Sequence, residues 1–549
     1  MASEFAKDLI RRWRSLEGSK SVWASHWEDL ATVFHPRRAG FVTSPIEGDK
    51  RTDNLYDGVP MQAARGLANS IGGLLRPDGQ PWFFIKPADD GIERSDEVAE
   101  WLAKSQDRLL TELLDPRTRF RQATGEVDLD LVVFGTGVLF AGEHPNLGTL
   151  LHQSIHLKDA TVVFGETGDP EGIFIARKMT LRNAVNKFGK EKLSEDTRKK
   201  IDEPNAKMDE KIEVLHAVVP RKEGKKNAML AKNLPFADIW IEVEAAHEIA
   251  VAGYHEFPFI VPRFDTTSGE DYGRSPGMIA LPDANSLQAM GRTILTAGQR
   301  AADPPLAVPF DSMIDAPNMF PGGLAYYDVD LAKELGSIPI QPIESGHNLA
   351  INRDIQNDVR QQVWSAFFRN VLNLPRQDHR MTATEVIQLK EEMLREIGPV
   401  FGRLETDYTA PVIERDFRVM LRAGAFDPIP EALQGRSIRF EYESPVKRIR
   451  QQVEAAAAQL WATEVAQLAQ VTGRPDVFDI VDVDALVRFG HEAKSLPHTL
   501  IRGAEEVAAI RQQRAEAEQA QAELASMQQI AEVADTGASA IKQLQQEAA

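Results

Sequence analysis

Ser275 has the sequence context of a hydrolase nucleophile. The segment Gly273-Arg274-Ser275-Pro276-Gly277 matches the G-x-S-x-G pattern, in which the backbone N–H after the serine helps to stabilise an oxyanion. Here the residue after the serine is Pro276, which has no N–H to donate. No clear strand precedes the segment either. We therefore interpret it as a loop that leads into a helix.

Two histidine-glutamate pairs each begin a zinc-protease motif. His247-Glu248 and His491-Glu492 supply the first half of H-E-x-x-H, but valine and serine stand where the second histidine belongs. Neither pair can therefore form the two-histidine zinc site of that motif, and we interpret both as chance pairs.

Two pairs of aspartates have the spacing of metal-binding carboxylates in nucleases. They are Asp128 with Asp130, and Asp482 with Asp484. The first pair flanks an apolar run, and the second begins an amphipathic helix, where carboxylates favour the positive helix end. We interpret both pairs as structural. The sequence thus predicts no catalytic residue, no metal site and no cofactor, and we expect the protein not to be an enzyme.

The bulk composition is that of a folded protein with several structural units. With 549 residues the chain is too long for one hydrophobic core. Hydrophobic residues make up 43% and charged residues 26%, which is typical of globular proteins. Cysteine is absent, so disulfides and sulfur-based metal sites are excluded. Residues 1–25 lack the apolar stretch of a secretion signal, and we expect neither export by a signal peptide nor a membrane span.

The net charge of −19 argues against a surface that grips nucleic acid, since such surfaces neutralise phosphates with clustered cations. The negative net charge does not exclude a protein with a pore through which DNA passes. A pore lined by carboxylates repels phosphate and lets DNA slide without sticking.

The first 275 residues show a mixture of helical and strand patterns. Trp23, Trp27, Leu30 and Phe34 recur at helical spacing and predict a buried helix face. Further helices are expected near 55–75 and 95–114, with a strand at 81–85. The pattern of residues 131–140 predicts two buried apolar runs around a tight glycine bend. This part is expected to be α+β.

Two helices bracket a proline-rich insert. The first is predicted from Pro282 to Ala302 and the second from about Asn352 to Leu372, so that the two have similar lengths. The insert from Asp303 to Gly346 holds seven prolines and Gly322-Gly323, which favours short strands and turns.

The last part of the chain is predicted to be mainly helical. A polar loop ends near Arg380, and a long helix begins at Thr382-Ala383-Thr384-Glu385, a capping box, with a kink expected at Gly398-Pro399. Residues 451–549 hold 7 Lys or Arg and 15 Asp or Glu. Helices are predicted at about 452–470 and 504–530. The second has a weak apolar face and would gain stability against copies of itself in a ring.

The order of these segments resembles the portal, or head-to-tail connector, family of short-tailed double-stranded-DNA bacteriophages, over almost the whole chain. Six stretches carry the resemblance: Trp23 to Pro36, Leu55 to Pro87 (LYDGVPMQAARGLANSIGGLLRPDGQPWFFIKP), Leu131 to Phe140 (LVVFGTGVLF), Pro262 to Gln288, Met381 to Arg415 and, more weakly, Leu496 to Gln521.

The resemblance implies a mainly helical α+β chain in a dodecameric ring with wing, stem, clip and crown regions around a DNA channel. It assigns the following ranges: 1–275 and 382–445 to the wing, 276–302 and 347–372 to the stem helices, 303–346 to the clip, 373–381 to a tunnel loop, and 446–549 to the helical crown.

The resemblance also implies site residues. Cations in and beside the tunnel loop are expected to meet DNA in the channel: Arg369, Arg376, His379 and Arg380. Residues of the clip are expected to bind the tail adaptor or the terminase: Pro309, Phe310, Pro321, Gly322, Tyr326 and Tyr327.

The implied partners are further copies of the chain, double-stranded DNA bound without sequence specificity, the terminase large subunit, tail adaptor proteins, the major capsid protein, and scaffold or internal core proteins. The implied location is the portal vertex of the virion, after assembly in the host cytoplasm. The alternative is an internal virion scaffold or core protein without a DNA channel, which would also be acidic and helical but would not need the proline-rich insert between paired helices.

Overall fold

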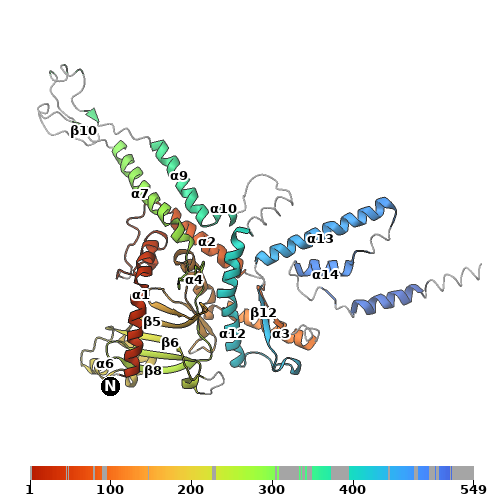
Figure 1. Cartoon of the computed structure of the whole chain (residues 1–549), viewed down its shortest axis with the longest axis horizontal. Helices are drawn as coiled ribbons and strands as arrows, with labels where there is room; N and C mark the ends of the chain where they lie inside the picture. Colours follow the sequence, from red (N-terminus) through yellow and green to blue (C-terminus); the bar gives the residue numbers. More distant parts are fainter. Residues whose placement is uncertain are drawn as a thin grey trace, which may run out of the picture. The chain divides into compact units, whose positions relative to one another are not determined.

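The computed structural model describes most of the chain in two compact units, Met1–Val446 and Lys447–Ala549 (Figure 1). The described residues are 3–77 without 45 and 47, 81–88, 96–302 without 146 and 225–229, 349–372, 395–442, 445–474, 480–493, 501–502, 506–519 and 521, together with 306–307, 330, 333, 336 and 341–342.

The core of the first unit is built on long helices that pack through aromatic side chains. Trp27, Leu30 and Phe34 of α1 are buried, as the helical spacing predicts. The indole N–H of Trp27 donates to the carbonyl oxygen of Phe134 at 3.2 Å, so this large side chain also satisfies its polar atom. The helices of this core are α1 (Glu4–Phe34), α2 (Val59–Leu75), α3 (Asp96–Leu114), α4 (Phe120–Phe134) and α12 (Ala410–Arg422).

A five-stranded antiparallel sheet with the order β4-β5-β6-β7-β8 forms the second layer of this unit (Figure 1). Leu9 and Trp13 of α1 lie in one hydrophobic cluster with Phe174 and Leu215 of the sheet. The first half of α1 thus covers one sheet face. The strands are β4 (Ala160–Phe164), β5 (Pro170–Thr180), β6 (Lys211–Pro220), β7 (Phe236–Glu242) and β8 (His247–Tyr254).

Smaller elements complete the unit. A three-stranded sheet has the order β3-β2-β9, and β1 pairs with β12 although the two are far apart in sequence. The helices α5 and α6 follow β5. The bounds are β1 (Phe83–Pro87), β2 (Leu139–Glu143), β3 (Leu150–Ser154), β9 (Phe259–Ile260), β12 (Ile438–Tyr442), α5 (Leu181–Phe188) and α6 (Glu195–Asp202). The predicted α+β character of this region is confirmed.

The glycine bend predicted within 131–140 joins the end of α4 to β2. Gly135 ends α4 with φ +80°, a left-handed conformation that favours glycine. A Cβ at Gly135 would lie 2.2 Å from the carbonyl oxygen of Gly273. The two glycines therefore let the α4–β2 connection pass against the loop that leads into α7.

The two helices around the insert are both present but differ in length. The first, α7 (Pro276–Ala302), begins six residues before the predicted start and ends where predicted. The second, α9 (Leu349–Ala366), is shorter than expected, because Phe368 adopts φ +56° and interrupts the helix before α10 (Arg369–Leu372). The prediction of similar lengths is therefore wrong, with 27 residues against 18. Within the insert, β10 (Leu306–Ala307) pairs antiparallel with β11 (Gln341–Pro342).

The long helix expected after the capping box is described from residue 395 onward. Its backbone is helical through Gly398 and Pro399. The change in helical hydrogen bonding comes later, in the π-helical segment Glu405–Thr409 that leads into α12. The start of this helix at Thr382 lies outside the described residues.

The second unit consists of helices. α13 (Pro445–Thr472) covers the predicted helix at 452–470, α14 (Val483–Ala493) follows, and residues 506–519 are helical. Asp482 caps α14 through a hydrogen bond from the N–H of Ala485 at 2.9 Å. Asp484 pairs with Arg511 at 2.5 and 2.7 Å. The structural interpretation of these two aspartates is confirmed. None of the helices in the described parts of the chain is long and apolar enough to cross a membrane.

The close approach at Gly135 can be tested by substitution. Gly135→Ala places a Cβ on a residue with a left-handed φ and brings that Cβ into overlap with the backbone of Gly273. The substitution should lower the free energy of unfolding by about 3 kcal/mol. Gly148 has φ +60° but no atom within 4 Å of its Cβ position. Gly148→Ala should therefore lose only about 1 kcal/mol. Denaturant unfolding of both variants measures the difference, and equal losses would show that the contact with Gly273 is unimportant.

Candidate functional site

The helix pair α7 and α9 is fastened to the turn that precedes α2. Gln288 of α7 makes three hydrogen bonds with this turn. Its Oε1 accepts from the N–H groups of Tyr56 at 2.7 Å and Asp57 at 2.9 Å, and its Nε2 donates to the carbonyl oxygen of Asp57 at 2.8 Å. One amide side chain thus satisfies three backbone groups of the turn.

Asp57 is the charged centre of this attachment. Its side chain is buried, and its Oδ2 accepts hydrogen bonds from Nε of Arg360 at 2.9 Å and Nε2 of Gln356 at 3.4 Å, both on α9. A second Arg360 nitrogen lies 2.8 Å from the same oxygen. The Oδ1 atom accepts from the N–H of Val59, the first residue of α2. The carboxylate therefore joins α2 to α9, while Gln288 joins the same turn to α7.

Gly291 allows α7 to approach the turn. A Cβ at this position would lie 2.9 Å from the Cβ of Tyr56, which is closer than ordinary contact. We name the set Asp57, Gln288, Gly291, Gln356 and Arg360 the helix joint. It fixes α7 and α9, each near its middle, to the turn that precedes α2.

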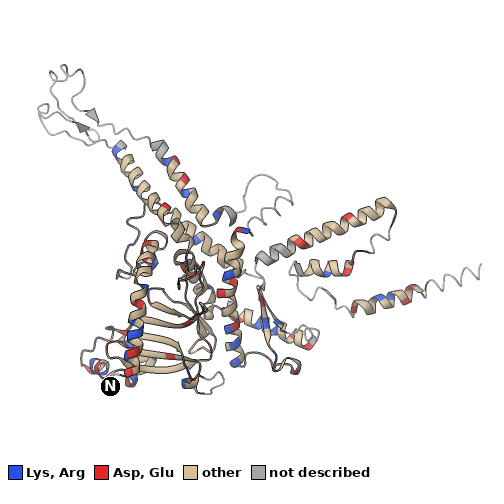
Figure 2. Ribbon diagram, viewed as in Figure 1, with Lys and Arg blue, Asp and Glu red and all other residues tan. Residues whose placement is uncertain are grey.

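One face of α7 is exposed and free of carboxylates. No Asp or Glu occurs from Ala284 to Ala302, in a chain whose net charge is −19. Figure 2 shows that charged residues are sparse along this helix. Its exposed residues include Leu295, which is apolar, and six residues with donors or small side chains: Asn285, Ala289, Arg292, Thr296, Gln299 and Arg300. Such a face offers hydrogen-bond donors and two cations to an anionic neighbour, and nothing that repels it.

Among the predicted channel cations, the structure describes Arg369. This residue begins α10, is exposed, and places its guanidinium 3.6 Å from the centroid of the Trp364 ring. Such a contact contributes about 0.5–1 kcal/mol at an exposed site. The other predicted site residues lie outside the described residues: Arg376, His379, Arg380, Pro309, Phe310, Pro321, Gly322, Tyr326 and Tyr327.

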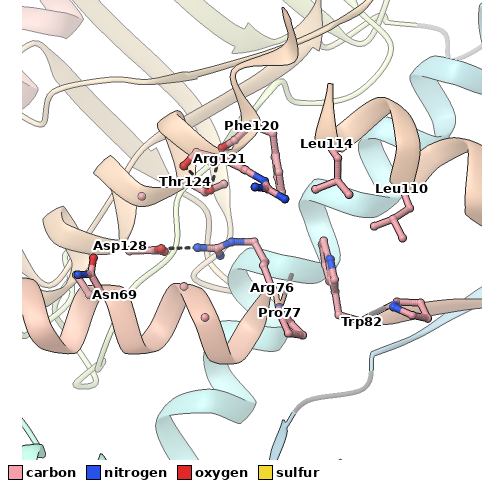
Figure 3. A pocket seen from close by; sticks show the side chains of 15 residues that line it. Asn69, Arg76, Pro77, Trp82, Leu110, Leu114, Phe120, Arg121, Thr124 and Asp128 are labelled. Carbon is pink, nitrogen blue, oxygen red and sulfur yellow. Dashed lines mark hydrogen bonds and ion pairs between the residues drawn. The ribbon is translucent and has the colours of Figure 1, made fainter. Parts of the chain in front are cut away.

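The opposite end of α2 is held by a second buried ion pair. Arg76, at the end of α2, pairs with Asp128 of α4 (Figure 3). The Arg76 guanidinium also lies 5.0 Å from the ring centroid of Tyr408, whose hydroxyl donates to the carbonyl oxygen of Thr124 at 3.2 Å. Burial raises the pKa of Asp128 to about 6, and the Arg76 charge opposes this shift.

Asp130, on the same helix, is buried in a separate environment. Its Oδ2 lies 3.4 Å from a guanidinium nitrogen of Arg38, and that nitrogen also contacts Glu126 at 3.1 Å. Neither carboxylate oxygen makes a hydrogen bond within the described structure. Burial raises the pKa of Asp130 to about 7, with Arg38 opposing and Glu126 adding to the shift. Asp128 and Asp130 thus serve two different arginines, which supports the structural interpretation.

Ser275 performs a structural task at the start of α7. Its hydroxyl donates to the carbonyl oxygen of Val133 at 2.7 Å and accepts from the N–H of Met278 at 3.1 Å. The segment is therefore the loop into a helix that the sequence predicts. Across the described ranges, no group of three or more His, Cys, Asp or Glu side chains is arranged to hold a metal ion.

Comparison with known proteins identifies the family. The family model for the bacteriophage head to tail connecting protein matches residues 6–501, and the chain belongs to this family. It is therefore a structural component that connects a bacteriophage head to its tail. The resemblance seen in the sequence is confirmed.

Alignments with two individual relatives cover nearly the full chain. A protein of Bordetella phage BPP-1 named "Probable portal protein" is 27% identical over 96% of this chain and 94% of that protein. A protein of Salmonella phage epsilon15 named "Portal protein" is 26% identical over 98% of this chain and 96% of that protein. A chain from the virion of a native gene transfer agent particle aligns with a TM-score of 0.37 at 12% identity, over 83% of this chain and 96% of that chain.

The helix joint yields a stability prediction. Arg360→Ala leaves the Asp57 carboxylate buried without its cation and should lower the free energy of unfolding by about 3 kcal/mol. Adding Asp57→Asn should restore part of this loss, because the uncompensated charge is then gone. Arg353→Ala, on an exposed position of the same helix, is the control and should change stability by less than about 0.5 kcal/mol. Equal effects of the two arginine substitutions in urea unfolding would contradict the joint.

Asp130 yields a prediction about pH. The folded pKa of about 7 lies above the ordinary value of 3.8, so the protonated carboxyl favours the folded state. That contribution is complete below about pH 4 and is lost as the pH rises through 7. Asp130→Asn stays neutral, so its stability relative to the parent should increase from pH 4 to 7 and then level off. Thermal unfolding across pH 4–8 measures this, and parallel curves would contradict it.

Proposed function

We propose that copies of this chain form the portal ring at one vertex of a bacteriophage capsid. Double-stranded DNA passes through the ring during packaging and ejection, and the ring is the docking site for the packaging motor and then for the tail. The observation that carries the proposal is the family match over residues 6–501. The two relatives named portal proteins, each aligned over nearly all of this chain, support it. No step of this function requires catalysis by the chain.

The described elements suit the regions of a portal subunit. We assign α7 and α9 to the stem, the insert 303–346 to the clip, and 373–381 to the tunnel loop. Residues 1–275 and 382–445 form the wing, and the helices of 446–549 form the crown. The helix joint then has a mechanical role, since it fixes both stem helices to α2 and therefore to the wing.

The charge pattern of α7 supports a channel that passes DNA without gripping it. Its exposed face carries Arg292 and Arg300 among neutral donors and lacks carboxylates. Phosphates meet weak, scattered attraction along such a face. Arg376, His379 and Arg380 of the tunnel loop supply further brief contacts, and Arg369 is positioned on Trp364 at the base of that loop.

The assembly context follows from the proposal. A dodecameric ring at the portal vertex of the virion meets the major capsid protein and the scaffold or internal core proteins. Its clip meets the terminase large subunit first and tail adaptor proteins later, through Pro309, Phe310, Pro321, Gly322, Tyr326 and Tyr327. Assembly takes place in the host cytoplasm. An internal scaffold or core protein is the competing function, and it predicts no effect of clip residues on tail attachment.

The tunnel-loop arginines provide one test. Replacing Arg376 and Arg380 by alanine should leave ring and prohead formation normal while packaged genome length or retention falls, more so at high salt, because cation contacts with phosphate are weak and salt-sensitive. The measurement is encapsidated DNA in particles built with the double variant. Full-length genomes that stay in place at all salt concentrations would show that these arginines do not act on DNA.

The clip provides a second test. Replacing Pro309–Tyr327 by a short Gly/Ser linker should leave rings intact and abolish binding of the tail adaptor. Ring formation is followed by electron microscopy and adaptor binding by co-sedimentation. Normal adaptor affinity in the linker variant would show that the insert does not bind the adaptor.

A further inference from the structure

The second unit, Lys447–Ala549, keeps its large apolar side chains on the outside. Among its described residues, the buried apolar side chains are small: Ala455, Ala462, Ala469 and Val481. Larger apolar side chains, between 44% and 87% exposed, lie on α13 and on or just before α14: Leu460, Trp461, Leu468, Val471, Ile480, Val483 and Val487. This distribution is the reverse of an ordinary core and is typical of an interaction surface.

The exposed residues of α13 follow the repeat of a coiled-coil seam. Along Trp461, Glu464, Leu468 and Val471 the spacing alternates between three and four residues, and Leu460 borders this row. Such alternation places side chains on one helix face that packs against a second helix. Figure 2 shows few charged residues along α13. We name these five residues the α13 seam, and its occupant is expected to be an apolar helix face.

The region of α14 carries a second, smaller apolar surface. Ile480 lies just before the helix, and Val483 and Val487 follow it at intervals of three and four residues. All three side chains are β-branched and exposed, so they present a shallow surface on which larger side chains can pack. We name these three residues the α14 stripe. Each copy of the chain thus has two different apolar surfaces in its second unit.

The two surfaces do not cover each other within one chain. α14 approaches α13 at Gly490, where an added Cβ would lie 3.2 Å from Nε2 of Gln459. Both the α13 seam and the α14 stripe stay exposed in this arrangement. The covering group for the seam therefore has to come from elsewhere.

The first unit offers no comparable surface. α1 exposes Phe5 and Val22, and α7 exposes Ile279 and Leu295, in each case far apart along the helix. No helix in the described part of this unit exposes three large apolar side chains. Within the described chain, the α14 stripe is therefore the surface that suits the α13 seam.

The charges beside the two surfaces are complementary. Glu464 lies within the α13 seam, and no cation among the described residues pairs with it. Arg488 follows Val487 and donates to the carbonyl oxygen of Arg502 at 3.4 Å, without an ion pair in the described part of the chain. Contact between a seam and a stripe brings a cation toward Glu464, which offsets the cost of enclosing that carboxylate.

We propose that the α13 seam of one copy packs against the α14 stripe of the neighbouring copy in the ring. Contacts around a closed ring are heterologous, so every subunit must carry two different surfaces that fit each other. The seam and the stripe are such a pair. The inference rests on the proposed ring and goes beyond it, because it names the surfaces through which the second units meet.

The absence of cysteine from the chain makes disulfide trapping a direct test. Two full-length chains with different affinity tags are co-expressed, one with Leu468→Cys in the seam and the other with Val487→Cys in the stripe. A single cysteine per chain excludes cross-links within one chain. Mild oxidation should yield dimers that carry both tags, because a disulfide forms where two Cβ atoms lie about 3.5–4.5 Å apart. Val483→Cys, one turn earlier, samples the neighbouring register.

A substitution in the seam sharpens the test. Trp461→Gln in the Leu468→Cys chain should lower the yield of two-tag dimers roughly tenfold or more, because it removes the largest apolar side chain of the contact. Val22→Gln is the matched control, since Val22 is exposed on α1 and belongs to neither surface. Denaturing electrophoresis measures the yield, and circular dichroism reports folding. Dimers of the Leu468→Cys chain with itself would indicate a two-fold contact between seams and would overturn the proposal.

Failure of this contact and failure of the proposed function give different results. If the parent protein forms no ring at any concentration, the proposed function is wrong and the contact falls with it. If electron micrographs show rings, but neither stripe cysteine cross-links to Leu468→Cys, the ring stands and only the contact between seam and stripe is wrong.

Discussion

Asp57 is a carboxylate from which water is almost excluded, and an isolated charge in such a place is strongly unfavourable. The protein resolves this constraint with groups from two helices that are distant in sequence. Arg360 and Gln356 of α9 donate to the Asp57 carboxylate. Gln288 of α7 accepts from the N–H groups of Tyr56 and Asp57 and donates to the carbonyl oxygen of Asp57. This site constrains the position of the helix pair, because neither helix can tilt away without leaving the carboxylate or the turn unsatisfied.

Helix α2, which follows the turn at Asp57, is fixed at both ends by side-chain contacts. At its beginning Asp57 accepts from the N–H of Val59, and at its end Arg76 pairs with Asp128 of α4 and lies over Tyr408. A 17-residue helix spans about 25 Å, so α2 connects the middle of α7 and α9 to the core around α4 and α12. A chain that serves as a connector needs such a link, since a force on the paired helices is then transmitted to the packed core.

Sequence reasoning found the elements whose signals are local. Trp27, Leu30 and Phe34 predicted the buried face of α1, and Asp303-Pro304-Pro305 predicted the end of α7. It missed the helix break at Phe368, because a phenylalanine with φ +56° is held there by its surroundings, with Phe367 packed on Phe34 at 5.4 Å. The π-helical segment at 405–409 has no local signal either.

The helix joint was not predicted for a related reason. Asp57 lies two residues before α2, which starts with Val59-Pro60, so its local sequence indicates only the start of a helix. The partners Gln288, Gln356 and Arg360 lie more than 230 residues away, and only the fold brings them to it. The prediction of a head-to-tail connector needed none of these contacts, because it rested on the order of segments along the chain.

The central claim is that the chain works as a ring whose paired helices α7 and α9 surround a channel. Cryo-electron microscopy of the purified full-length protein tests it most directly. We expect closed rings with a central hole wide enough for duplex DNA, in which α7 and α9 of each subunit border the hole. Single subunits under all conditions, or rings with α7 and α9 on the outer surface, would contradict it.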